Sequence, residues 1–295
     1  MRELQPSRTA EYMALFRAVE TFENPRRRLF EDPFATALLS GNLKLFAEMA
    51  RVPILRRLLR GVLDVGWPYT RSSGVVRTRS IDDLVRDAIR CGTKQLVLLG
   101  AGFDSRAYRL EEARNIRTFE VDHPATQRAK RERLGRRLGS IPDGVHFVEV
   151  NFERDDLELK LKQVGFDERI PAVVLWEGVV SYLSEPAVAA NMAVLARLLA
   201  PASRLILTYV HRGAVDGSVE FPGSRRWKSW VGRSGEPFIF GFDPATLAEE
   251  VARYGFLLQS DVSTAEAAQH YCGLNGRRES GSELYRIASM SRAGV

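Results

Sequence analysis

Three residues that could hold a nucleoside follow or end short apolar runs in this sequence. Gly100 and Gly102 come directly after residues 95–99, and glycine there lets the backbone approach a ligand closely. Asp122 ends the next apolar run, 20 residues beyond Gly102. A carboxylate at that place can accept hydrogen bonds from both hydroxyls of a ribose. These residues predict a site for a nucleoside-containing cofactor.

Two further polar residues end apolar runs in the same way. Asn151 follows residues 146–150, where its side chain could face an adenine amino group while Phe152 covers the ring. Glu177 follows residues 172–176. Because ligands of open α/β sheets bind beyond the carboxyl ends of the strands, we expect all these residues to meet at one edge.

Four of these residues also have a purely structural alternative. The glycines could form only a tight strand-to-helix turn, Asp122 could cap a helix that begins at Pro124, and Asn151 could be a turn residue. A third glycine of the dinucleotide fingerprint is missing, because position 105 is serine. This argues against NAD, although an NAD-dependent oxidoreductase remains an alternative.

The elements that must position these residues alternate between strands and helices. Helices are predicted over 124–138, 185–199 and about 244–254, and the second has Ser184 as its cap. Such alternation favours a Rossmann-like α/β fold whose sheet is mostly parallel and covered on both faces. We predict seven strands, at residues 95–99, 117–121, 146–150, 172–176, 204–210, 256–262 and 283–290.

Two regions lie outside this alternation. Residues 1–94 are predicted to form a helical N-terminal extension before an α/β domain at 95–295. The helices of this extension are expected from Ser7 or Thr9 to Phe22, from Asp32-Pro33 onward, and over 53–63 and 79–90. Residues 211–242, rich in glycine, aromatic and basic residues, interrupt the pattern after the fifth strand. We expect this insertion to be a lid.

The composition is that of an ordinary globular protein with a formal net charge of +6. Only two cysteines occur, and no apolar stretch approaches the roughly 18 residues of a membrane span. We therefore expect a cytoplasmic protein with no membrane partner and no metal. The basic run at 128–137 is predicted to be a solvated helix face, with a tRNA- or phosphate-binding face as the alternative.

Longer strings of residues extend beyond these local signals. The chain resembles the leucine carboxyl methyltransferase-like family, in particular its bacterial branch of O-methyltransferases that use S-adenosylmethionine (SAM). The most specific strings are the extended glycine loop and VDHP. The matching stretches are SRTAEYMALFRAVE, DPFA at 32–35, VRTRSIDDLV, QLVLLGAGFDSRAYRL, FEVDHPATQRAK, GFD at 165–167, WEGVVSYL and GEPFIFGFDP.

The resemblance implies a class I methyltransferase fold and a role for each site residue. Arg77 would hold the SAM carboxylate through two parallel hydrogen bonds, and Arg79 is a near alternative. Gly100 would lie against the methionine part, and Glu177 would face the methionine amino group or the ribose. Asp122 would bind the ribose, and Asn151 with Phe152 would bind the adenine. The family usually has aspartate at the position of Asn151, yet asparagine keeps an acceptor oxygen.

We expect methyl transfer to an oxygen of a small-molecule acceptor, with a tRNA-modifying or nucleic-acid-binding protein as a further alternative. A carboxylate acceptor needs no general base, whereas a hydroxyl acceptor does; the candidates are Tyr182, Tyr209 and His211. Arg225 and Arg226 could attract an acidic acceptor. Aromatic side chains could line an apolar acceptor site or belong to the core: Phe16, Phe22, Trp227, Trp230 and Phe240.

Overall fold

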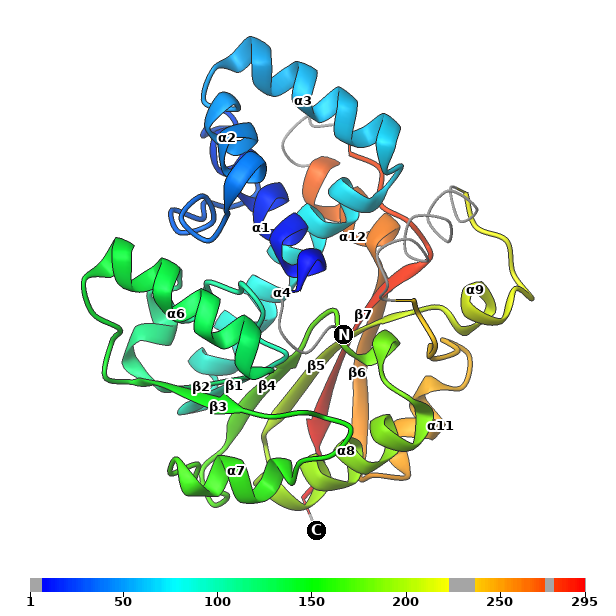
Figure 1. Ribbon diagram of the computed structural model, residues 1–295. Coiled ribbons are helices and arrows are strands. Elements are labelled where there is room, and N and C mark those ends of the chain that lie inside the picture. Colours follow the sequence, from blue (N-terminus) through cyan, green and yellow to red (C-terminus); the bar gives the residue numbers. More distant parts are fainter. Residues whose placement is uncertain (1–6, 223–236, 274–278, 295) are drawn as a thin grey trace.

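A seven-stranded sheet forms the centre of the molecule, as the sequence predicts (Figure 1). The computed structural model describes residues 7–222, 237–273 and 279–294. The strands follow the order β3-β2-β1-β4-β5-β7-β6; β1 to β5 are parallel, and β7 is antiparallel to both of its neighbours. Their bounds are β1 (Gln95–Leu99), β2 (Arg117–Asp122), β3 (Val145–Glu149), β4 (Ala172–Trp176), β5 (Arg204–Val210), β6 (Phe256–Ser263) and β7 (Tyr285–Arg292).

Helices cover both faces of the sheet because the central strands are apolar on both sides. In β1 all five residues are buried; Val97 and Leu99 belong to the core under α7, α8 and α11, whereas Leu96 and Leu98 belong to the core under α4. The main helices are α1 (Arg8–Thr21), α2 (Gly41–Met49), α3 (Pro53–Gly66), α4 (Thr70–Arg90), α5 (Arg106–Arg109), α6 (Pro124–Leu138), α7 (Leu157–Gln163), α8 (Glu185–Leu198), α9 (Arg212–Asp216), α11 (Leu247–Ala252) and α12 (Thr264–Gly273).

The first three helices lie together at one end of the molecule, beyond the sheet, and α3 is the farthest from it (Figure 1). They share a second apolar core with α4, α6 and α12. Ser7 caps α1 by accepting a hydrogen bond from the Ala10 amide at 3.2 Å, and Ser184 does the same for α8. Ser184 was predicted as the cap of its helix, and Ser7 was one of the two candidates, with Thr9, for the start of α1.

The predicted helix at Asp32-Pro33 is wrong. Residues 33–38 form turns instead. The Asp32 side chain accepts hydrogen bonds from the amides of Phe34 and Ala35, both at 3.1 Å, and its other oxygen binds Arg17 at 2.8 Å. The carboxylate thus stabilises a local turn and a long-range contact, and the chain becomes helical again only at α2.

Four other helices also differ from the prediction. α4 begins at Thr70 rather than at residue 79, so Arg77 lies well inside it. The helices α2 and α12 were not predicted, and α11 is shorter than the predicted 244–254. Among the described residues, no helix is both long enough and apolar enough to cross a bilayer.

Candidate functional site

A cavity of about 550 Å³ lies at the carboxyl ends of the parallel strands, where α1 and α4 close its other side. Strand counting predicts that the candidate residues converge here, and the structure brings them together. The seven residues with expected cofactor roles all line the cavity: Arg77, Gly100, Gly102, Asp122, Asn151, Phe152 and Glu177.

The glycine loop after β1 can be built only with glycine at its first position. Gly100 has a φ of +66°, and a Cβ atom there would lie 2.1 Å from Cγ2 of Val179. Both the left-handed backbone and the close approach of the loop after β4 therefore exclude a side chain. The loop leaves its backbone open to the cavity.

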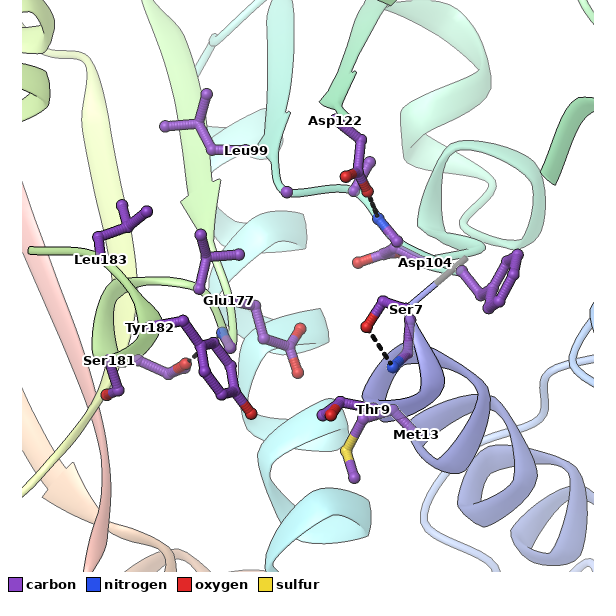
Figure 2. A pocket seen from close by; sticks show the side chains of 18 of the residues that line it. Ser7, Thr9, Met13, Leu99, Asp104, Asp122, Glu177, Ser181, Tyr182 and Leu183 are labelled. Carbon is purple, nitrogen blue, oxygen red and sulfur yellow. Dashed lines mark hydrogen bonds between the residues drawn. The ribbon is translucent and has the colours of Figure 1, made fainter. Parts of the chain in front are cut away.

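Asp122 supports this loop directly. Its carboxylate accepts hydrogen bonds from the amides of Gly102 and His123, the second at 2.6 Å (Figure 2). Burial raises the pKa of Asp122, and the two amide hydrogen bonds oppose that shift. The residue that caps α6 is His123, whose Nδ1 accepts from the Ala125 amide at 3.4 Å. Asp122 is therefore not the helix cap considered from the sequence.

Glu177 is held between two arginines. Its Oε1 accepts from Nε of Arg77 at 2.8 Å, and its Oε2 accepts from Nη1 of Arg106 at 2.7 Å. Burial disfavours the charged form, yet the charges of Arg106 and Arg77 hold the pKa of Glu177 below its usual value. The carboxylate is therefore ionised at neutral pH and fixes the position of the Arg77 guanidinium.

The Nη2 group of Arg77, which does not bind Glu177, has only a weak hydrogen-bond acceptor among the residues that the structure describes. Nη2 contacts Sδ of Met13 at 3.3 Å, and a thioether is a poor hydrogen-bond acceptor that a carboxylate would displace. Arg79 lies elsewhere: it binds Asp83 at 3.1 Å and the Leu29 carbonyl at 2.8 Å, and it does not line the cavity. Of the two arginines considered, Arg77 is the one at the site.

A buried charge network below the glycine loop was missed by sequence reasoning. Arg106 and Arg109, on α5, share the carboxylate of Asp82 on α4, with distances of 2.8 and 2.6 Å. All three side chains are at most 3% exposed. Asp32 joins the network from the turn before α2, because it accepts from Ser105 at 2.6 Å. The only sequence signal was the string DSRAYRL, whose arginines had no assigned role.

The part of the cavity at Asn151 is a local turn. Oδ1 of Asn151 accepts from the Glu153 amide at 3.0 Å, and the Asn151 carbonyl accepts from the Arg154 and Asp155 amides. Asn151 is thus a turn residue, as one alternative predicted, and it also lines the cavity. Phe152 packs partly against the core beneath α8.

The three candidate bases lie in different environments. Tyr182 lines the cavity, and Figure 2 shows it beside Glu177, facing Thr9 and Met13 of α1. Tyr209 also borders the cavity, but its hydroxyl donates to Asp261 at 2.8 Å and burial raises its pKa, which disfavours a basic role. His211 caps α9 by accepting from Gly213 and is not a lining residue.

Only one of the described aromatic candidates for an acceptor site lines the cavity. Phe16 lines the cavity, whereas Phe22 and Phe240 do not. Phe240 is a core residue against Phe242, and Phe22 packs beside the core of α1 to α3. Four further candidates lie outside the described residues: Arg225, Arg226, Trp227 and Trp230.

Sequence reasoning missed the aromatic wall opposite the strands. Tyr12 of α1 and Trp67, which follows α3, both line the cavity, and their rings lie 5.1 Å apart. From the predicted lid, Phe238 and Ile239 reach the cavity, and the Ile239 amide donates to the Ser181 carbonyl at 2.8 Å. No local pattern could reveal this wall, because its parts meet only in the folded chain.

The basic run of α6 is partly turned inward. Lys130 is 1% exposed and lies 2.8 Å from Glu120 of β2, and Arg133 binds Glu11 of α1 at 2.7 Å. The prediction of a wholly solvated helix face is therefore wrong for these two residues. Part of the positive charge of this run is neutralised within the fold.

Comparison with known proteins identifies the family. The family profile described as leucine carboxyl methyltransferase matches residues 10–196. The chain belongs to the leucine carboxyl methyltransferase family. A Streptomyces avermitilis protein, named as a SAM-dependent methyltransferase, is 34% identical over 268 residues, which cover 85% of this chain and 90% of that protein. A Frankia alni protein with the same description is 36% identical over 218 residues, or 70% of each chain.

A solved structure supports the same fold. The crystal structure of a protein described as a methyltransferase, from Thermobifida fusca, has a TM-score of 0.59 and 19% identity, and covers 92% of this chain and 95% of its own. The chain is therefore a SAM-dependent methyltransferase of this family with a class I methyltransferase fold. The resemblance drawn from the sequence is confirmed, and the oxidoreductase alternative is set aside.

Proposed function

We propose that this member of the family transfers the methyl group of SAM to an oxygen atom of a small-molecule acceptor, and that the residues lining the cavity hold both molecules. The observation that carries the proposal is the cavity itself. Its volume of about 550 Å³ is of the size that proteins use for small ligands. It combines a charged end at Glu177 with an aromatic wall at Tyr12 and Trp67.

The residues present fit SAM at three points. The Arg77 guanidinium, oriented by Glu177, has donors directed at the weak acceptor Met13, where the carboxylate of SAM would accept two hydrogen bonds. The Asp122 oxygens each have a further lone pair for a ribose hydroxyl. Gly100 lines the cavity with its backbone, against which the methionine part would lie.

SAM supplies an electrophilic methyl group on a sulfonium, so the chain itself has to align the acceptor and exclude water. Alignment alone can lower a barrier by several kcal/mol. The aromatic wall of Tyr12 and Trp67 would hold an apolar acceptor body against the strand ends. For a carboxylate acceptor no protein base is required, and for a hydroxyl acceptor Tyr182 is the candidate best placed to contact it.

The family description supports oxygen as the nucleophile, because a carboxyl group accepts the methyl through oxygen. We would test this by incubating the chain with SAM that carries a labelled methyl group and with panels of carboxylic acids, phenols, amines and thiols. We expect label in a methyl ester or ether; mild base releases methanol from an ester but not from an ether. Transfer only to nitrogen, sulfur, RNA or protein would overturn the proposal. Arg79→Ala, outside the cavity, is the matched control that should retain activity.

A further inference from the structure

The outward side of α3 carries an aliphatic ridge, which we define as Ile54, Leu58, Val62 and Val65. Each of these side chains is between 63% and 71% exposed. Their spacing along the helix places them on one side, while Leu59 and Leu63 turn inward to the core. The helix is therefore apolar on both its inner and its outer side.

Neighbouring residues extend this surface. Among the described residues, eleven large apolar side chains are exposed, and seven of these lie on or between α2 and α3. The other four lie in separate parts of the chain, so exposed apolar side chains are concentrated on α2, α3 and the turn between them. The three that join the aliphatic ridge are Leu45, Met49 and Val52.

Positive charge gathers in the same part of the chain. Residues 1–94 contain 17 Lys and Arg against 11 Asp and Glu, whereas residues 95–295 contain 26 of each. The whole excess of six positive charges therefore belongs to the N-terminal part. Three basic residues are exposed on α2, on α3 or between them: Lys44, Arg51 and Arg57. Arg57 lies one residue before Leu58, and Arg51 is paired with Glu48. Arg56 and Arg60 turn inward to Glu23.

The position of α3 leaves this surface accessible. α3 is the helix farthest from the sheet in Figure 1, on the outside of the N-terminal layer. It ends at Gly66, and the next residue, Trp67, lines the cavity. A surface that received the aliphatic ridge would therefore lie close to the aromatic wall of the site.

We propose that the aliphatic ridge docks on an anionic lipid bilayer, with α3 lying in the headgroup region. A helix with aliphatic side chains on one side and basic residues beside them binds such an interface through apolar burial and charge attraction. Long basic side chains such as Arg57 can keep their charge among the headgroups while their stems cover apolar surface. A second copy of the chain fits less well, because pairing two ridges would bring like charges together.

The test is sedimentation of the full chain with vesicles, without cofactor or acceptor, so that it does not depend on methyl transfer. We expect binding to vesicles that contain phosphatidylglycerol, weaker binding to pure phosphatidylcholine, and a decrease with salt. Leu58→Glu and Val62→Glu should each lower the partition coefficient by about tenfold or more, because a charge replaces an apolar side chain that would be buried in the bilayer. The matched control, Leu257→Glu on β6, changes a residue that is 54% exposed and should bind as the parent does.

Two outcomes overturn the proposal. One is equal partitioning of the parent, Leu58→Glu and Leu257→Glu chains. The other is a dimer in sedimentation velocity that Leu58→Glu dissociates while no vesicle binding occurs, which would make the aliphatic ridge an interface between two copies. Circular dichroism and thermal melting of each variant verify that the exposed substitutions leave the fold intact.

Discussion

At one end of the cavity Glu177 is held by two arginines from different helices, whereas at the other end Asn151 holds only its own turn. The first arrangement joins α4, α5 and the loop after β4 through buried charges. The second depends on hydrogen bonds within a few residues and remains half exposed. The Glu177 end, proposed for the methionine part of SAM, is thus fixed by tertiary structure, and the Asn151 end, proposed for the adenine, by local sequence. Substitutions at the two ends should differ accordingly.

The largest effect is expected at Arg106, and it is an effect on stability. Arg106→Met removes a buried cation that binds Asp82, Asp104 and Glu177. Breaking a buried ion pair by removing one partner costs about 3–5 kcal/mol. Urea unfolding should show this loss. The matched control is Arg90→Met, because Arg90 is an exposed partner of Glu112 and should cost less than about 1 kcal/mol. Equal losses would mean that the network does not stabilise the fold.

The next largest effect is expected on SAM affinity, at Asp122 in the middle of the cavity. Asp122→Ala should weaken SAM binding about 10- to 150-fold, which corresponds to roughly 1.5–3 kcal/mol for hydrogen bonds to a charged acceptor. Calorimetry measures the change, and Asp143→Ala, at an exposed position away from the cavity, is the control. An unchanged affinity in a folded Asp122→Ala chain would limit Asp122 to supporting the glycine loop.

Asp122 also predicts a pH dependence of binding. Burial raises its pKa, so the carboxylate takes up a proton at a higher pH than an ordinary aspartate does. The ribose hydroxyls need the ionised acceptor, so SAM affinity should fall as the pH decreases through this raised pKa. The Asp122→Ala chain should lack that part of the profile. A parent profile identical to that of the variant would contradict the assignment.

A smaller and more selective effect is expected at the methionine end. Arg77→Ala should weaken SAM about tenfold, at the lower end for charged hydrogen bonds, because the side chain is partly exposed. Adenosine should bind nearly as before, since it has no carboxylate. Arg77→Lys should recover only part of the loss, because an ammonium cannot make the planar two-point contact. Arg79→Ala is the control; if it discriminates SAM from adenosine and Arg77→Ala does not, the assignment is wrong.

The smallest effect is expected at the adenine end. Asn151→Ala removes one neutral hydrogen bond, so SAM affinity should fall by less than about tenfold, or roughly 0.5–1.5 kcal/mol. Asn151→Asp, which restores the residue usual in the family, should bind at least as tightly as the parent. Competition binding measures both. A loss larger than that of Asp122→Ala would show that the local turn dominates cofactor binding and would reverse the comparison.

The sequence predicted the sheet and the strand-end residues well for a physical reason. The strands at 172–176 and 204–210 have the predicted bounds, because strands buried on both faces are continuous apolar runs. In a parallel sheet the carboxyl ends share one edge, so Asp122 and Glu177 could be placed from strand counting alone.

The charge network and several helices could not be predicted. Arg106 and Asp82 are polar residues that local patterns assign to the surface, and only tertiary pairing explains their burial. Asp32 followed by proline is typical of the start of a helix. One carboxylate oxygen of Asp32 nevertheless binds Arg17, a contact distant in sequence, and only turns follow. The aromatic wall likewise combines α1 with the segment after α3.

The place of β7 in the sheet constrains how the chain can assemble. β6 is synthesised before β7, but among the described strands β7 is the only one that pairs with it, and β7 also pairs with β5. As a nascent chain leaves the ribosome, β6 therefore has to wait for a strand that emerges later. A chain that stops before residue 285 would leave the edge of β5 bare and β6 unattached, and such open edges favour aggregation and degradation. Quality control of this protein in the cell should accordingly act most strongly on products of premature termination.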